Sequence, residues 1–381
     1  MTGRACRLCG GRLSADDLLL AGVPAGAQAF ADSAECAMTA RTDLRIAACD
    51  GCGLVQSVSP PPPTFRQVIT AAGLSPAMRN HRRQRLAAFV DRYGLAGKRC
   101  IEVGCGRGEM LALLAEAGVD PTGIEAGGEG RTGDGHPIVD AYPGQEAMLP
   151  GAPYAAFVCL NFLEHAPAPR AFLASINDAI GHQGCGLLEV PNFAQRQRHG
   201  RSFDYVADHV SYFDPETLET ALRLAGFRVD RIDETRDGET IEAWVGKRAQ
   251  PDFTADRKRI AEARLAVAEA MQSAGRRGGR LAIWGASHQA LTLLAGLDGR
   301  DLLGVFDSAP FKQGRYAPAS GLPILVPSTA AVAGATEILI IASGYEQEIA
   351  RQLRARYGFG GRILSLSRGR VVAFEPAECH P

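Results

Sequence analysis

Four cysteines in two Cys-x-x-Cys pairs carry the most specific chemistry in this sequence. Cys6 and Cys9 form one pair, Cys49 and Cys52 form the other, and a glycine follows each pair. Two thiolates at this spacing chelate one ion, the glycine lets backbone amides face the sulfur atoms, and two pairs complete a tetrahedron. Because four protein ligands leave no open position, the pattern predicts a structural Zn²⁺ site. Cys36, between the pairs, is interpreted as a small buried hydrophobic residue.

A second candidate site lies where a short apolar run ends in alternate glycines. Gly104, Gly106 and Gly108 follow Glu102, and leucines at helical spacing come next, which predicts a strand, a tight turn and a helix. A dinucleotide fingerprint would need a further glycine at the position of Glu109. Since Glu102 would repel a pyrophosphate but accept a hydrogen bond from an ammonium group, the turn favours a positively charged amino-acid ligand over a phosphate.

This turn resembles the first motif of the class I S-adenosylmethionine-dependent methyltransferases, Glu/Asp-x-Gly-x-Gly-x-Gly. Farther on, a short strand ends in an acid, Glu125, at the place where a carboxylate meets a ribose diol. The resemblance implies S-adenosylmethionine as cofactor, and another use of a Rossmann-type sheet is the alternative. The expected cofactor contacts are Glu102, Gly104, Cys105, Gly106, Gly108, Glu125 and Asn161.

Length and charge limit the remaining possibilities. The 381 residues are enough for two or three domains, and a formal net charge of -1 gives no general attraction to nucleic acid or an anionic membrane. The apolar runs are too short to span a bilayer, and the first residues contain no apolar signal core, so we expect a cytoplasmic protein. In that reducing compartment, the ten cysteines are expected to be metal ligands and buried thiols.

Alternating strands and helices position the candidate residues. Further strands are expected at 137–140, 155–160 and 186–192, with a helix starting near Pro169. This order predicts an α/β fold with a doubly wound parallel sheet, whose ligands lie beyond the carboxyl ends of the strands. The expected parts are a zinc-binding domain at 1–75, a cofactor-binding domain at 76–250, and a helical connector with a second, smaller Rossmann-like domain at 251–381.

Two histidines near that sheet edge are candidates for proton transfer. His165 follows the strand at 155–160. His209 has Asp208 beside it as a possible orienter, and Tyr205 and Tyr212 as possible proton partners. We therefore consider His209 a candidate general base, with a purely structural histidine as the alternative.

A basic run, His81 to Arg85, precedes the glycine turn on a helical pattern. It is either a basic patch for RNA or phosphate, or the solvated face of an amphipathic helix, which is favoured.

Several passages together resemble the sugar-nucleotide C-methyltransferases, three-domain bacterial enzymes of deoxysugar biosynthesis. Besides the cysteine pairs and the glycine turn, they are Asn161-Phe162-Leu163-Glu164-His165, Asp208-His209-Val210-Ser211-Tyr212-Phe213, and the Asp-x-x-Pro-x-Lys-Gln-Gly-x-Tyr pattern from Asp307 to Tyr316. The resemblance implies methylation of a keto-sugar nucleotide next to its carbonyl, through an enolate. By match, His209 is the base, Asp208 stands in the place of the family's glutamate, and His165 faces the substrate.

The C-terminal pattern places further residues near the substrate. The resemblance implies that Lys312 and Arg315 meet a nucleotide diphosphate, with the domain interface as an equal alternative, and Tyr316 and His288 complete the expected set. Two Rossmann-like sheets in one chain suggest the cofactor on one and the substrate between both. The expected partner is a small molecule, a nucleoside-diphosphate sugar, bound by a monomer or small homo-oligomer, without nucleic acid or membrane.

The sequence also departs from the family. A Tyr-x-Tyr-x-Ser-Ser-x-Ser run is replaced by residues 68–75, which keep only the last serine, and Val206 stands where a tyrosine is expected. These changes leave the exact sugar and the methylated carbon open. The alternatives are an O- or N-methyltransferase for another small natural product, an RNA base methyltransferase, and a cofactor-binding sensor.

Overall fold

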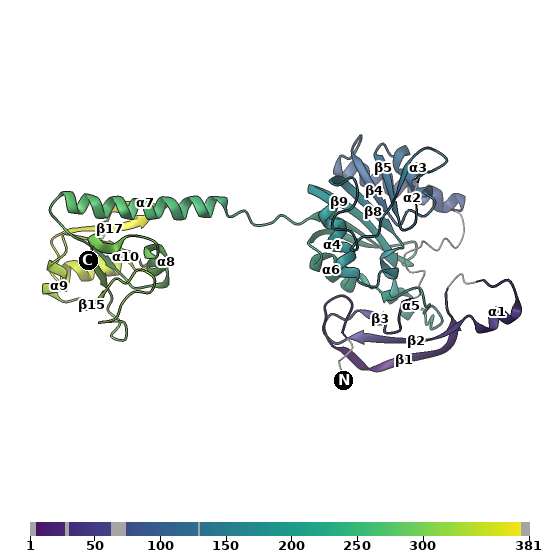
Figure 1. The fold of residues 1–381 in the computed structure, drawn as a ribbon, viewed down its shortest axis with the longest axis horizontal. Coiled ribbons are helices and arrows are strands. Elements are labelled where there is room, and N and C mark those ends of the chain that lie inside the picture. Colours follow the sequence, from purple (N-terminus) through teal and green to yellow (C-terminus); the bar gives the residue numbers. More distant parts are fainter. Residues whose placement is uncertain (1–4, 27–29, 62–73, 129, 375–381) are drawn as a thin grey trace. The chain divides into compact units, whose positions relative to one another are not determined.

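The computed structural model describes residues 5–26, 30–61, 74–128 and 130–374. The chain folds as two compact units, Met1–Ala249 and Gln250–Pro381 (Figure 1). Residues 68–73, which replace most of the family's tyrosine and serine run, lie outside the described residues. Among the residues that the structure describes, no helix is both long and apolar enough to cross a membrane.

The N-terminal segment forms an antiparallel sheet that recruits a strand from far along the chain. Its order is β1-β2-β3-β10. In β10, Ser211 pairs with Gln56 and Tyr212 with Val55, and the N–H of Ser57 donates to the Val210 carbonyl at 3.0 Å. The elements are β1 (Leu13–Pro24), α1 (Ala34–Thr39), β2 (Arg41–Cys49), β3 (Val55–Ser57) and β10 (Ser211–Tyr212).

One hydrophobic core joins this small sheet to the rest of the first unit. Leu8 and Leu54 belong to the same buried cluster as Phe157 and Leu188 of the large sheet. Cys36 takes no part in it: α1 has no buried residue and the Cys36 thiol is exposed, so its interpretation as a buried hydrophobic residue was wrong.

The large sheet of the first unit has eight strands in the order β11-β12-β9-β8-β4-β5-β7-β6. The five strands from β9 to β7 are parallel, which confirms the doubly wound fold. The bounds are β4 (Arg99–Val103), β5 (Asp120–Glu125), β6 (Gly130–Arg131), β7 (Pro137–Asp140), β8 (Tyr154–Leu160), β9 (Ile180–Pro191), β11 (Phe227–Thr235) and β12 (Thr240–Lys247).

Antiparallel strands complete both edges of this sheet, where the sequence predicted parallel strands alone. β6 pairs with β7, and the hairpin of β11 and β12 is added beside β9. The hairpin is possible because Arg236, Asp237 and Gly238 all have positive φ, which reverses the chain within four residues.

Helices cover both faces of the large sheet (Figure 1). Alternate residues of β4 point to opposite faces: Cys100 packs in the cluster of α2 and α3, and Ile101 packs in that of α4 and α6. The helices are α2 (Pro76–Tyr93), α3 (Glu109–Glu116), the 3₁₀ turn η1 (Leu163–His165), α4 (Pro169–Ala179), α5 (Phe193–Arg198) and α6 (Pro215–Leu224).

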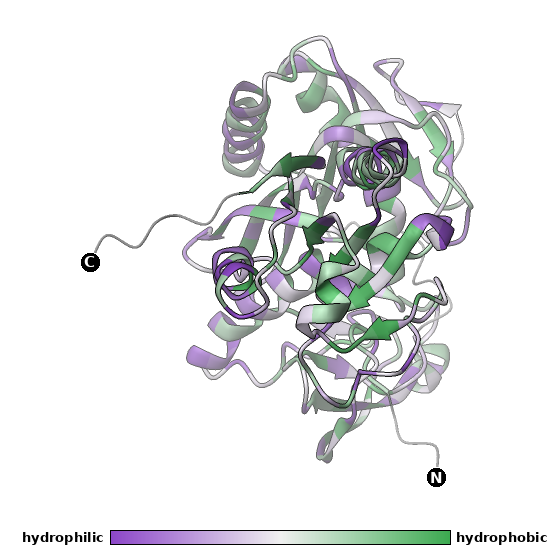
Figure 2. Cartoon of the chain, turned by 90° about the vertical axis from the view of Figure 1, so that its left-hand side faces the viewer, coloured by the Kyte–Doolittle hydropathy of each residue, from purple (hydrophilic) through white to green (hydrophobic). Residues whose placement is uncertain are grey.

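The second unit is a smaller sheet of order β15-β14-β13-β16-β17-β18, parallel except for β18. The helix α7 buries Ala263, Val267, Met271 and Ala274, one stripe at helical spacing. Figure 2 shows the corresponding contrast between largely hydrophobic strands and helices with both hydrophilic and hydrophobic bands. The elements are α7 (Thr254–Arg276), β13 (Leu281–Trp284), α8 (His288–Leu294), η2 (Gly299–Asp301), β14 (Leu302–Phe306), β15 (Ile324–Leu325), α9 (Thr329–Ala333), β16 (Glu337–Ile340), α10 (Glu346–Ala355), β17 (Arg362–Ser367) and β18 (Arg370–Ala373).

Candidate functional site

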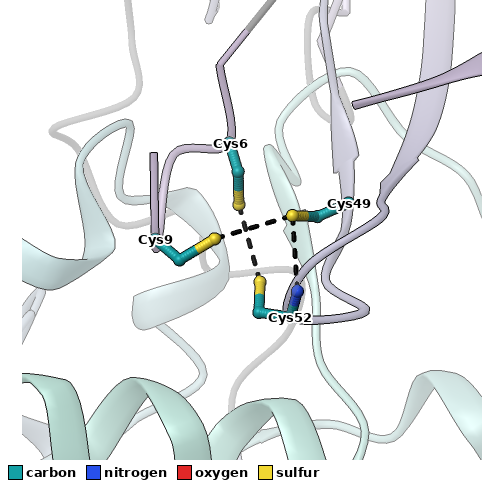
Figure 3. A group of neighbouring side chains, drawn as sticks. All are labelled: Cys6, Cys9, Cys49 and Cys52. Atoms are coloured by element: carbon teal, nitrogen blue, oxygen red, sulfur yellow. Dashed lines mark hydrogen bonds between the residues drawn. The ribbon is translucent and has the colours of Figure 1, made fainter. Parts of the chain in front are cut away.

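The four predicted cysteine ligands converge on one point (Figure 3). Sγ of Cys6 lies 3.7 Å from Sγ of Cys52, and Sγ of Cys9 lies 3.6 Å from Sγ of Cys49. Four sulfurs around a tetrahedral ion with bonds of about 2.3 Å would be about 3.8 Å apart. The cluster therefore has dimensions compatible with Zn²⁺.

Backbone amides face the sulfurs, as the glycines after each pair predicted. The N–H of Gly11 donates to Cys9 at 3.3 Å, and the N–H groups of Gly51 and Cys52 donate to Cys49 at 3.3 and 3.4 Å. Burial alone would raise the pKa of Cys49, but hydrogen bonds from the Cys52 and Gly51 amides and from the Cys9 and Cys52 thiols outweigh it and lower that pKa to about 7. The amides thus favour the thiolate, which is the form that binds a metal.

Arg7 ties this cluster to β3 and to the loop after η1. Its backbone N–H donates to the side-chain oxygen of Gln56 at 2.9 Å, and its guanidinium donates to the carbonyls of Ser57 and Pro167. Pro167 is two residues beyond His165, while Ser57 and Gln56 pair with the segment after His209. The cysteine cluster and its loop therefore support both histidine-bearing segments.

The glycine turn has the backbone geometry that its sequence predicted. Gly104 and Gly108 have φ of 73° and 82°, a region that side chains disfavour, and a Cβ on Gly104 would come within 2.5 Å of Phe162. The N–H of Gly106 donates to Oε2 of Glu125 at 2.9 Å, so the acid that ends β5 closes on the turn after β4. Cys105 is buried beside them.

Glu102 is a buried acid at the end of β4. It is 4% exposed, and burial together with the Glu125 carboxylate holds its pKa well above the usual value. Among the described residues, Oε2 of Glu102 has no hydrogen-bond partner. A buried acceptor and a glycine turn suit a nucleoside ligand that carries an ammonium group, so these residues fit S-adenosylmethionine.

Asn161, at the end of β8, is held in position by the neighbouring strand. Its φ is 52°, its N–H donates to the Glu189 carbonyl at 2.8 Å, and its side-chain amide donates to Glu189 Oε1 at 2.9 Å. Glu189 in turn receives two hydrogen bonds of 2.5 and 2.6 Å from Arg82 of α2. This buried bidentate pair fixes the residue that follows the central strand.

Buried Arg82 and half-buried Arg85 pair with two buried glutamates. Glu189 of β9 and Glu242 of β12 are directly opposite each other and are both 0% exposed. Arg82 pairs with the first and Arg85 with the second, and Trp244 Nε1 also donates to Glu242 at 2.6 Å. The prediction that the basic run is a solvated helix face was therefore wrong for these residues, since the arginines balance two adjacent buried carboxylates.

His165 and His209 lie against each other. Their rings meet edge to face with centroids 4.8 Å apart, and one ligand atom from each lies within 4.8 Å of a Glu164 carboxylate oxygen. Burial lowers the pKa of His165. Burial, repulsion from any proton on His165 and the charge of Arg196 lower the pKa of His209 well below its usual value. Burial raises the pKa of Glu164 to about 8.

Asp208 meets this pair through its main chain. Its carbonyl oxygen lies 2.9 Å from Nδ1 of His165. Because a carbonyl only accepts, Nδ1 of His165 carries the hydrogen and Nε2 of the neutral ring is an acceptor. Neutral His165 therefore cannot donate a hydrogen bond through Nε2 to an oxyanion of the substrate, which it was expected to face.

The two tyrosines differ in their availability. The hydroxyl of Tyr212 donates to the Val206 carbonyl at 3.1 Å and accepts from the Val206 N–H at 3.2 Å, so it braces the loop. Tyr205 lines a cavity of about 410 Å³ together with Arg196, and its ring centroid is 5.2 Å from that of Tyr212.

The second unit contains the four remaining predicted residues. Lys312 Nζ donates to Asp307 Oδ2 at 2.9 Å and to the Ala286 carbonyl at 3.1 Å, so it locks the turn after β13 to the end of β14. The other three are exposed: Arg315, Tyr316 and His288.

Comparisons with known proteins identify the family. A Methyltransferase domain family matches residues 78–232, and the C-methyltransferase C-terminal domain family matches residues 229–366. The C-methyltransferase NovU of Streptomyces niveus is 23% identical over an alignment of 418 positions, gaps included, which covers 97% of each chain. This chain is an S-adenosylmethionine-dependent methyltransferase of the C-methyltransferase family.

Two further proteins are similar to part of the chain. The ubiquinone biosynthesis O-methyltransferase of Nitrosospira multiformis is 32% identical over 173 residues, 38% of this chain and 69% of that protein. The crystal structure of magnesium protoporphyrin IX methyltransferase from Synechocystis PCC 6803, with bound SAH, is 15% identical, with a TM-score of 0.36 over 47% of this methyltransferase and 90% of that chain. The expectation of a methyltransferase is confirmed.

Three supporting arginines were missed or misjudged from the sequence. Arg82 and Arg85 were visible as a basic run, and buried acids at 189 and 242 on two strands were the available hint that this run is paired. Arg7 lies inside the first cysteine pair. Its position next to a predicted metal ligand was the only sign in the sequence that it supports the cluster.

Proposed function

We propose that this methyltransferase adds a methyl group to the carbon next to the carbonyl of a keto-sugar nucleotide. The full-length similarity to a C-methyltransferase and the matching sequence passages support a carbon acceptor. The observation that carries the proposal is the pair of half-buried histidines in edge-to-face contact, whose lowered pKa values favour the neutral form. Removing a proton from carbon requires such a general base, whereas a hydroxyl acceptor is more acidic and loses its proton to a weaker base.

His209 is the proposed base. Its lowered pKa keeps the ring neutral at cellular pH, so a lone pair is available. When His209 takes the proton, the electron pair of the C–H bond forms a carbon–carbon double bond and the π pair of the carbonyl moves onto its oxygen, which gives an enolate. His165 Nε2, an acceptor because of the Asp208 carbonyl, then accepts from the protonated His209 ring. His165 thus takes the orienting role that the sequence assigned to the Asp208 carboxylate.

Tyr205 is the proposed donor to the enolate oxygen, because the Tyr212 hydroxyl is already bonded to Val206. S-adenosylmethionine, when bound, supplies an electrophilic methyl group and leaves as a neutral thioether. We assign its contacts to the glycine turn, Glu102 and Glu125. Alignment of donor and acceptor is worth on the order of 7 to 11 kcal/mol.

Two further assignments accompany the reaction. The four cysteines hold a structural Zn²⁺, because their spacing and amide contacts suit it and leave no open ligand position. Arg315, Tyr316 and His288 remain candidate contacts for the nucleotide part of the substrate. For Lys312, whose Nζ donates to Asp307 and to the Ala286 carbonyl, we infer the structural role that the sequence left as the alternative.

Solvent exchange tests the base. With a keto-sugar nucleotide in deuterated water and no methyl donor, wild-type protein should exchange the acceptor C–H. We expect His209→Asn to lose this exchange and turnover by roughly 100-fold or more while S-adenosylmethionine still binds. His182→Asn, which changes an exposed histidine of β9, is the matched control. Exchange at the wild-type rate in His209→Asn would remove His209 from the base role.

O-methylation of another small molecule is the second candidate, favoured by the 32% identity to an O-methyltransferase. Melting shifts separate the two. A sugar-nucleotide enzyme should be stabilised by a panel of nucleoside diphosphates, by about 2.7 kcal/mol at one hundred times Kd. Product analysis by NMR then distinguishes a new carbon–carbon bond from a methyl ether.

A further inference from the structure

Glu164, His165 and His209 share a property that the proposed proton transfer does not use. Each presents one ligand atom within 4.8 Å of the other two; Glu164 is buried and the two histidines are half-buried. Among the described residues, Glu164 Oε2 has no hydrogen-bond partner although the residue is 2% exposed. A buried oxygen without a partner, beside two imidazoles, is a place where a cation would satisfy every group at once.

The hydrogen bond of His165 prepares its ring for a metal. Nδ1–H donates to the Asp208 carbonyl, which leaves the Nε2 lone pair free of hydrogen. This is the usual outer contact of a metal-bound histidine, since the second hydrogen bond fixes both tautomer and ring orientation. The backbone also holds the trio together, because the Val210 N–H donates to the Glu164 carbonyl at 2.9 Å.

We propose that Glu164, His165 and His209 form a second cation site, separate from the cysteine cluster, that takes Zn²⁺. Two imidazoles and a carboxylate are a common zinc ligand set that leaves one position open. Ligand atoms around Zn²⁺ with bonds of about 2.0 to 2.1 Å lie about 3.3 Å apart, so the trio closes with side-chain shifts on the order of 1 Å. Arg196, whose charge reaches His209, opposes the cation, so this site is weaker than the four-cysteine site.

Zinc in this site would block the reaction. This part of the inference rests on the proposed function: the ion would take the lone pairs of His209 and His165, which the proton transfer needs. The enzyme is then inhibited by free Zn²⁺ at concentrations that leave the cysteine cluster filled. Glu164 holds the ion without being assigned a part in the proton transfer.

Metal stoichiometry tests the site. Protein carrying Cys36→Ser, which removes an exposed thiol, is loaded with one Zn²⁺ and titrated with more by calorimetry. We expect a second equivalent to bind, and Glu164→Gln and His165→Asn each to raise its dissociation constant by about 10-fold or more. His182→Asn should leave it unchanged. Co²⁺ in the second site should lack the thiolate charge-transfer band of the cysteine site, a readout independent of activity.

The outcomes separate the two proposals. A single equivalent in the parent protein, or a second equivalent that persists unchanged in Glu164→Gln and His165→Asn, overturns the cation site. A second equivalent that is lost in these variants establishes it. If turnover in the wild type then falls with occupancy while S-adenosylmethionine binding stays constant, the block of the base is supported. Full turnover with the second site filled refutes the base role of His209 and leaves the cation site standing.

Discussion

Replacing Arg82 by methionine should be among the most destabilising single changes in the first unit. The substitution keeps the length of the side chain but leaves Glu189, which is 0% exposed, directly opposite the equally buried Glu242. The Glu189 carboxylate then keeps its hydrogen bond from the Asn161 amide, which carries no positive charge. Breaking a buried ion pair from one side costs about 3 to 5 kcal/mol, because it leaves an uncompensated charge.

The two tryptophans of the chain allow this cost to be measured in one unit. Trp244 lies beside Glu242 in the first unit and Trp284 lies in β13 of the second, so Trp284→Phe makes Trp244 the reporter of urea unfolding. In that background, Arg82→Met should lower the free energy of unfolding by about 3 to 5 kcal/mol. Adding Glu189→Gln should recover most of the loss, since no unpaired charge remains.

Arg83 supplies the matched control. It pairs with Glu116 on the surface, where both side chains are nearly half exposed, so Arg83→Met should cost only about 0 to 1 kcal/mol. An equal loss in Arg82→Met and Arg83→Met would refute the argument that burial of the Glu189 pair decides its importance.

Three further predictions follow from features of the two units. Removing metal from the cysteine cluster with a chelator under reducing conditions should lower turnover more than cofactor binding, because β3 and β10 lose their support. One equivalent of Zn²⁺, enough to fill the cysteine cluster alone, should restore both, as rates and calorimetry would report. Gly104→Ala should weaken S-adenosylmethionine binding by roughly 10-fold or more, since it adds a clash with Phe162 to backbone strain of about 1 to 2 kcal/mol. Gly97 is also at positive φ but has open space around it, so Gly97→Ala should add the backbone strain without a clash. Burial would raise the pKa of Asp307, but the Ala309 amide and Lys312 outweigh it and lower that pKa. The Asp307 carboxylate therefore stabilises the fold above about pH 4, and this contribution is lost as the pH falls below that. Thermal melts followed by Trp284 should show Asp307→Asn less stable than wild type at pH 6 and equal to it at acid pH.

Local chemistry made parts of this enzyme predictable from the sequence. The cysteine pairs and the glycine turn are short patterns whose geometry is set within a few residues, so the cluster and the positive φ of Gly104 followed from spacing alone. The parallel strands were recognisable because each is a buried apolar run ending at the same sheet edge. These features need no knowledge of distant contacts.

The contacts that complete the site join residues far apart in the chain. Arg82 meets Glu189 across 107 positions and Arg85 meets Glu242 across 157, and nothing in a helical basic run reveals which acids it will face. The tautomer of His165 depends on the direction of one backbone carbonyl. Likewise, the pairing of β10 with β3 has no sequence pattern, since each partner is only two or three residues long.

That pairing of β3 with β10 also orders the assembly of the enzyme. Most strand pairs of the large sheet form between neighbours in the chain, whereas Gln56 and Ser211 are brought together only by closing a loop of more than 150 residues, which is entropically costly and slow. The donor-binding sheet can therefore fold first, and the histidine segment reaches its final place when the N-terminal segment docks. In this order the glycine turn forms before the histidine segment is in place, so the residues that we assign to proton transfer complete the site last.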